Sequence, residues 1–207
     1  MSEATVSPLF LSVDIDFWAG RINEALLAER YLDKVAAQCR TFNIPLNAVT
    51  NHQQMLPLVD ASNATTLVNI DTHSDLAGDD VDELNTGTWV SYVKWRRNGH
   101  YHWIQGRDIA WGECNGSSPI FSPNGKHNYS LTDWGSLQRT YTLSLPHPGR
   151  WIVGTTTRCV GVGVCLSPAW CSEDLSKVFH AWRKRWKVSY RRGRIEEERM
   201  GTKRVPR

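Results

Sequence analysis

The chain has 207 residues, of which 41% are hydrophobic and 22% charged, and its formal net charge is +3. This length suffices for one compact domain with a sizeable core, and the composition is ordinary for a soluble globular protein. It has no apolar run of about eighteen residues and no basic start with an apolar stretch, so neither a membrane span nor export is expected.

Three buried strands are predicted in the first part of the chain. Residues 9–16 (LFLSVDID) and 65–70 (TTLVNI) are apolar and β-branched, and residues 44–50 form a shorter run of the same kind. Between them, apolar residues recur on one face of a helix predicted over 22–40, and a short helix interrupted by Pro57 is expected over 53–59.

The later part of the chain has a less regular pattern. A helix is predicted over 86–97, whereas residues 100–150 mix Gly, Ser, Asn, Pro and aromatic residues, as long loops or β-hairpins do. A strand over 158–166 and a helix over 174–188 follow. Strands that alternate with helices predict a single-domain, three-layer α/β/α fold with a mostly parallel sheet.

Charge divides the chain into an acidic domain, residues 1–179, and a basic tail, residues 180–207, which has eleven Lys/Arg and three Glu. An acidic domain attracts cationic substrates at long range. The tail is interpreted as a solvated helix with a frayed end, and nucleic-acid binding through its basic residues with Trp182, Trp186 and Tyr190 is the alternative.

Cysteine usage indicates a reducing environment. The chain has five cysteines, an odd number with irregular spacing and no C-x-x-C pair. We therefore expect reduced thiols in a cytoplasmic protein and no cysteine-rich zinc site.

Acidic and histidine side chains follow the first three predicted strands, at the point where each strand ends. The carboxyl ends of parallel strands meet at the edge where α/β proteins bind ligands. Residues two apart on an extended segment point to the same side. If the three strands are neighbours, one crevice receives six side chains: Asp14, Asp16, His52, Asp71, His73 and Asp75.

Four aspartates in one crevice would repel each other and stay partly protonated without a cation. Two divalent ions remove this difficulty, and carboxylate oxygen with imidazole nitrogen suits manganese or iron. Taken singly, each motif has a structural explanation, because a D-x-D or the Asn51-His52 pair can cap a helix. Their coincidence at three strand ends favours a metal centre.

The acidic motifs resemble those of the arginase/agmatinase/deacetylase superfamily. SVDID at 12–16 is similar to its S-x-D-x-D motif and DTHSD at 71–75 to its D-A-H-x-D motif, in the opposite chain order, which implies a permuted topology. A closer resemblance is to a small family with this same order, which includes peptide arginases of ribosomal peptide natural-product pathways. SVDIDFW, NIDTHSDL, TGTWVSYVKWRRNGHYHW and VGVGVCLSPAW carry that resemblance, which covers roughly residues 8–175.

The resemblance implies a centre with two Mn²⁺ ions. Asp14 and Asp71 would bridge the ions, His52 and Asp75 would complete one, and Asp16 and His73 the other. The G-G-D-H motif of arginases is absent, so His52 is assigned by its position at a strand end.

The resemblance also implies a catalytic apparatus around the ions. Asp75 would orient the attacking water and accept its proton, and His100 or His102 would serve as the general acid, with an ordinary loop histidine as the alternative. Glu113 and Asp80 are candidates to hold the substrate's guanidinium group, with a surface acidic loop as the alternative.

The activity implied is hydrolysis of arginine residues in a precursor peptide to ornithine and urea. Ten tryptophans suit a groove that grips an extended peptide, although aromatic residues also build cores. The alternatives are another metal-dependent C–N hydrolase, deacetylase-like or agmatinase-like, a dinuclear phosphoesterase, or nucleic-acid binding through the tail.

Overall fold

The computed structural model describes residues 7–73, 75, 84, 86–94, 100–105 and 157–191. Its strands are β1 (Ser7–Asp14), β2 (Leu46–Val49), β3 (Thr66–Asp71), β4 (His100–Gln105), β5 (Thr157–Cys165) and β6 (Ser189–Arg191). Its α-helices are α1 (Glu24–Thr41), α2 (Leu56–Ser62) and α5 (Glu173–Trp186), and its 3-10 helices are η1 (Ile15–Trp18), η2 (His52–Met55) and η3 (Trp89–Tyr92).

The six strands form one sheet in the order β4-β3-β1-β5-β2-β6, and every neighbouring pair is parallel. The predicted α/β fold with a mostly parallel sheet is therefore confirmed. β1 and β5 are central, and their long register runs from Ser7 opposite Thr157 to Asp14 opposite Cys165.

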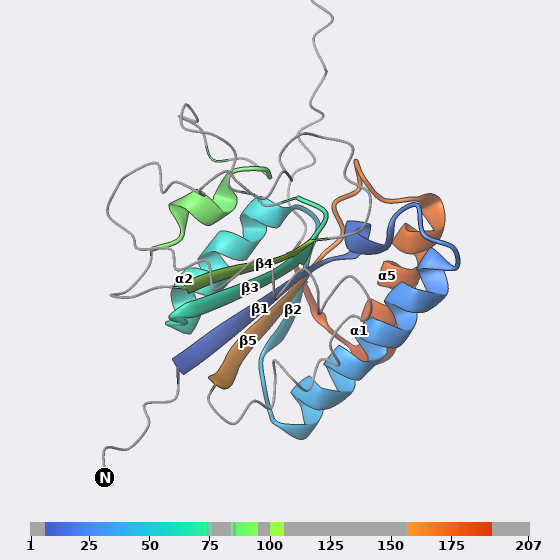
Figure 1. The fold of residues 1–207 in the computed structure, drawn as a ribbon. Helices are drawn as coiled ribbons and strands as arrows, with labels where there is room; N and C mark the ends of the chain where they lie inside the picture. Colours follow the sequence, from blue (N-terminus) through green and yellow to red (C-terminus); the bar gives the residue numbers. More distant parts are fainter. Residues whose placement is uncertain are drawn as a thin grey trace, which may run out of the picture.

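Helices cover both faces of the sheet (Figure 1). Leu9, Leu11 and Val13 of β1 point to one face, where they share a core with buried residues of α1 and α5. Phe10, on the other face, shares a second core with residues of η2, α2 and η3. Successive side chains of a strand alternate between faces, so a strand that is buried on both sides needs the near-continuous apolar sequence of β1.

Two glycines on β5 let the second face pack closely against the sheet. A Cβ atom on Gly163 would lie 2.3 Å from Sδ of Met55, and one on Gly161 would lie 2.9 Å from the ring of Phe10. The Met55 side chain of η2 therefore occupies the space that a side chain at position 163 would need.

Some elements differ from their sequence predictions. β4 lies in a region expected to hold loops or hairpins, yet it pairs in parallel with β3. Within the described part of the predicted helix 86–97, the helical structure is the single 3-10 turn η3. Pro57 does not interrupt α2, because it occupies the first turn, where proline's missing N–H has no partner to lose.

Residues 180–191 continue the fold without a break. α5 runs through to Trp186 and β6 joins β2 at the sheet edge. Trp182 is fully buried, Trp186 Nε1 donates to Asp33, and the hydroxyls of Tyr190 and Thr50 lie 2.8 Å apart. These aromatic rings hold the fold together, and a buried Trp182 has no face to offer a nucleic-acid base.

Of the helices that the structure describes, none combines the length and hydropathy needed to cross a bilayer.

Candidate metal centre

The site lies at the carboxyl edge of the sheet, where β1 and β3 are neighbours. The chain leaves β1 toward α1 on one face, whereas after β3 the next described element, η3, packs in the core of the opposite face. Divergent connections from adjacent parallel strands leave a crevice outside their carboxyl ends, the usual ligand site of open α/β sheets.

The first half of the cluster is centred on the imidazole of His52. Its Nδ1 lies 2.8 Å from Asp75 Oδ2, 2.9 Å from Asp71 Oδ2 and 3.3 Å from Asp14 Oδ2. Its Nε2 lies 3.3 Å from the hydroxyl of Ser12. The imidazole and the three carboxylates are all at most 4% exposed, so this half is sealed from solvent.

The second half groups Asp16, Asp71 and His73. Nδ1 of His73 lies 3.5 Å from Asp16 Oδ2 and 3.9 Å from Asp71 Oδ1. The backbone N–H of His73 donates to Asp71 Oδ1 at 2.8 Å, and that of Thr72 donates to Asp16 Oδ1 at 3.4 Å. The His73 side chain is 33% exposed, so this half is the open side of the cluster.

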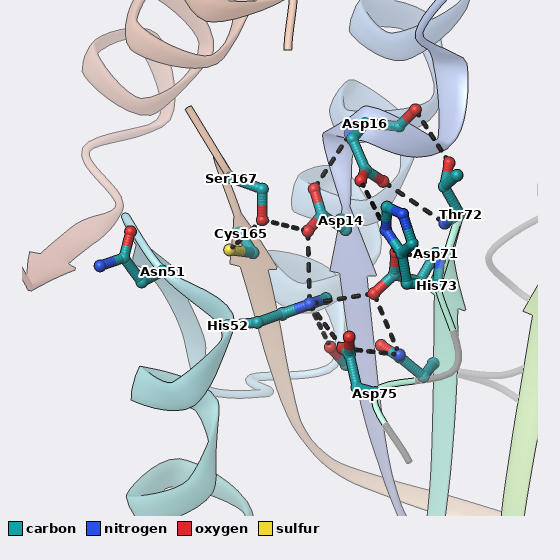
Figure 2. A network of polar contacts seen from close by, with 12 residues as sticks. Asp14, Asp16, Asn51, His52, Asp71, Thr72, His73, Asp75, Cys165 and Ser167 are labelled. Carbon is teal, nitrogen blue, oxygen red and sulfur yellow. Dashed lines mark hydrogen bonds and ion pairs between the residues drawn. The ribbon is translucent and has the colours of Figure 1, made fainter. Parts of the chain in front are cut away.

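Asp71 belongs to both halves, and Figure 2 places it between them. Ligand atoms within 4.8 Å of one another form two overlapping groups that could each hold a metal ion, His52 with Asp71 and Asp75, and Asp16 with Asp71 and His73. The structure thus brings together all six side chains that the sequence assigns to a metal centre. A third group of this kind adds Cys165 to Asp14 and His52.

Burial and mutual repulsion change the protonation of the cluster when no cation is present. Burial, followed by the charge of Asp16, raises the pKa of Asp14 to about 7. Burial and the neighbouring carboxylates raise the pKa of Asp71 well above its usual range. Burial lowers the pKa of His52, but the surrounding negative groups outweigh this effect and hold it well above its usual range.

One expectation about strand neighbours needs correction, because β2 is not adjacent to β1. β5 lies between them, so His52, which begins η2 just after β2, has to reach across β5 to Asp14. Gly163 makes this reach geometrically feasible, because it lets η2 lie directly on the strand. The N–H groups of Thr50 and Asn51 donate to Gln54 Oε1 at 2.9 and 3.0 Å, which fixes the turn before His52.

Two further residues, Asn69 and Trp89, donate hydrogen bonds to carboxylates of the cluster. Asn69 Nδ2 donates to Asp71 Oδ2 at 3.2 Å and lies 3.5 Å from Asp75 Oδ2. Trp89 Nε1 donates to Asp75 Oδ2 at 2.5 Å, and its ring lies against His52, with the ring centroids 5.4 Å apart. The sequence could have indicated the role of Asn69, because it precedes Asp71 by two residues on the same strand and so points to the same side. No pattern in the sequence links Trp89 to Asp75.

The segment that follows β5 supplies polar groups that the sequence interpretation did not assign. Ser167 Oγ donates a short hydrogen bond to Asp14 Oδ2, and Cys165 Sγ lies 3.2 Å from the same hydroxyl. Cys165 pairs with Asp14 in the strand register, so its place beside the cluster follows from the position of β5 in the sheet.

Of the candidate general acids and substrate-binding residues, the structure describes the side chain of His102 alone. On β4, Tyr101 and Trp103 belong to the core on the site's face and Ile104 to the opposite core, so strand alternation directs His102 to the face opposite the site. The structure therefore does not bring His102 into the cluster. The side chain of His100, and Glu113 and Asp80 altogether, lie outside the described residues.

The donor set fits a divalent cation. Four aspartate carboxylates meet two imidazoles, so in their ionised form the carboxylates outnumber the positive charges that the two histidines can supply. Carboxylate oxygens with imidazole nitrogens are ligands for manganese, iron or zinc, and a bound cation relieves the repulsion that raises the carboxyl pKa values. The buried Asp/His groups lie close enough to hold a metal ion.

Comparisons of the chain with protein families, with curated proteins and with solved structures find no match.

Proposed function

We propose that this protein is a dinuclear, manganese-dependent hydrolase of arginine side chains in a peptide. One observation carries the proposal: Asp71 is shared by two adjacent groups of candidate ligands, so that one carboxylate can bridge two ions. Asp14 lies between the same two groups, since His52 contacts its Oδ2 and the backbone of Asp16 its Oδ1.

Two ions held by these residues would supply a nucleophile from water near neutral pH. The protein's own groups do the rest. Trp89 holds Asp75, which orients the attacking water and accepts its proton. Ser167 donates to the carboxylate of Asp14 and Asn69 to that of Asp71. These two hydrogen bonds hold the carboxylates that lie between the two halves of the centre. The sealed side around His52 excludes bulk water, so the substrate approaches from the side of His73.

The substrate class follows from the resemblance and from charge. Water adds to the guanidinium carbon, the bond from this carbon to the side-chain nitrogen breaks, and the leaving amine takes a proton, which yields ornithine and urea. The acidic domain formed by residues 1–179 adds long-range attraction for a cationic guanidinium group. We also propose that the helices and the sheet form an arginase-like three-layer fold in which the strands follow a permuted chain order.

Urea release tests the proposal. Manganese-loaded protein should release urea from arginine-containing peptides, and Asp71→Asn or Asp14→Asn should lower the rate by at least about a thousandfold, because each removes a bridging carboxylate. Asp33→Asn is the matched control, since Asp33 lies on the surface and pairs with Arg185. It should keep full activity.

Metal analysis separates the alternatives. Two ions per chain, lost together in Asp71→Asn, support the dinuclear centre, whereas one zinc ion per chain favours a deacetylase-like hydrolase. Urea from agmatine or free arginine but from no peptide would replace the peptide substrate with a small one. Metal-loaded protein that is inactive on all of these would defeat the arginine substrate and leave the metal centre standing.

A further inference from the structure

Trp170 is unusual among the large apolar side chains near the cluster, because it is 59% exposed. Its indole lies against His73, with the ring centroids 5.0 Å apart and the planes 54° from each other. Trp89, whose ring lies against His52 in the sealed half, is in contrast fully buried. An exposed indole therefore stands on the open side of the site and touches a candidate metal ligand.

The turn that carries Trp170 is built onto the cluster. The N–H of Trp170 donates to the carbonyl of Ser167 at 3.0 Å, and Ser167 in turn donates through its hydroxyl to Asp14. Ser167 has a φ of 45°, in the left-handed region that non-glycine residues rarely adopt. The next residues are also anchored, because Cys171 Sγ donates to the carbonyl of Leu166 and Ser172 Oγ donates to Glu24. The backbone that carries the indole is thus anchored beside the candidate metal ligands.

The chemistry of this place favours a delocalised cation. An aromatic face attracts a guanidinium group through its electron-rich π system, and Trp gives the strongest such contact. The apolar methylene stem of an arginine side chain also packs well on an indole.

We propose that Trp170 is the substrate-binding platform of the site and holds the arginine side chain against its indole face. The inference rests on the proposed function, and it names the residue that recognises the substrate on the open side. Its geometric basis is the exposed ring in contact with His73.

Steady-state kinetics of urea release provide the first measurement. Trp170→Ala should raise KM for an arginine-containing peptide about tenfold, equivalent to about 1.4 kcal/mol of binding. kcat should change less than KM, and the manganese content should stay the same. Trp170→Phe, which keeps a smaller π face, should lie in between. Phe42→Ala is the matched control, because Phe42 is 50% exposed and ends α1 at the opposite edge of the sheet.

A binding measurement without turnover keeps this inference separate from the proposed function. Calorimetric titration of the manganese-loaded protein with methylguanidinium should show binding that Trp170→Ala weakens about tenfold. The neutral isostere N-methylurea should bind more weakly to the unaltered protein.

The outcomes are distinguishable. Urea release with the same KM in Trp170→Ala would overturn the inference and leave the function intact. Loss of manganese in Trp170→Ala would also overturn it, since the ring would then position His73 and not the substrate. Equal binding of N-methylurea would show an apolar surface instead of a cation site. Binding of methylguanidinium through Trp170, without urea from any peptide, would support the inference and defeat the proposed function.

Discussion

Asp75 has a strained backbone, with a φ of 54°, and its carboxylate is oriented by a residue fourteen positions later. The indole N–H of Trp89 donates to Asp75 Oδ2, and the backbone N–H of Val90 donates to the Asp75 carbonyl at 3.3 Å. Both contacts come from η3, so this short turn holds the carboxylate and the backbone that positions it. Groups that orient metal ligands in this way affect affinity nearly as much as the ligands do.

Trp89→Phe tests this role, because it keeps most of the ring and removes the N–H donor. We expect a loss of stability of about 1–3 kcal/mol, since a buried carboxylate loses a hydrogen bond. Manganese affinity should fall by about 10–100-fold. Thermal unfolding and manganese titration measure the two effects.

Trp182→Phe is the control, because Trp182 of α5 is also fully buried but lies in the core on the other face. It should destabilise the protein without changing manganese affinity. The same affinity in Trp89→Phe as in the unaltered protein would contradict the role given to Trp89.

At the scale of residues, the sequence predicts the candidate ligands better than it predicts the residues that donate hydrogen bonds to them. Asp71, His73 and Asp75 lie in one five-residue stretch, so local geometry brings them together, although residues 72, 73 and 75 form bends and are not extended as the predicted alternation assumes. The contacts of Trp89 and Ser167 with the cluster depend on how distant segments return to the sheet. No local pattern contains that information.

Glycine at position 163 links element packing to the site. It lets η2 rest on β5, and η2 begins with His52. We expect Gly163→Ala to destabilise the protein by about 1–3 kcal/mol, because the new methyl group would displace Met55. Met55 ends η2, the turn that begins with His52, so we expect its displacement to disturb His52 and manganese stoichiometry to fall toward one ion per chain.

Gly161→Ala is the matched comparison on the same strand. Its Cβ would meet the ring of Phe10 and not η2, so it should cost stability without loss of manganese. Equal manganese binding in both variants, measured by elemental analysis, would disprove the link between Gly163 and His52.

Elements with a strong apolar pattern are those that the sequence predicts. β1, β3 and β5 are buried runs, and α1 and α5 have clear amphipathic faces, so their bounds agree within a few residues with those predicted. β4 and β6 were missed for different physical reasons. β4 mixes histidine with aromatic residues, and β6 has only three residues and owes its conformation to pairing with β2.

Across the whole molecule, the buried cluster makes the stability of metal-free protein depend on pH. The pKa of Asp14 rises from 3.8 to about 7 on folding, so folded protein binds this proton more tightly. The resulting stability is fully present below about pH 4 and is lost as the pH rises toward 7. Asp71 and His52, whose pKa values are also raised, change stability in the same direction.

We therefore expect metal-free protein to melt at a lower temperature at pH 7.5 than at pH 5.5. Manganese should reduce or reverse this difference, because the cations replace the protons. Asp14→Asn without metal should show a weaker dependence on pH. Melting curves at several pH values, with chelator and with manganese, test this, and a melting temperature that rises with pH in the chelator-treated protein would contradict it.

The position of β5 has a consequence for how the protein is made. All six candidate ligands lie between residues 14 and 75, but β5, at residues 157–165, occupies the place between β1 and β2. A ribosome therefore finishes every ligand long before it finishes the strand that His52 must lie across. A nascent chain that stops before residue 157 would carry the whole ligand set but lack the strand that His52 lies across, so a metal ion held through His52 would be bound only after β5 has been made.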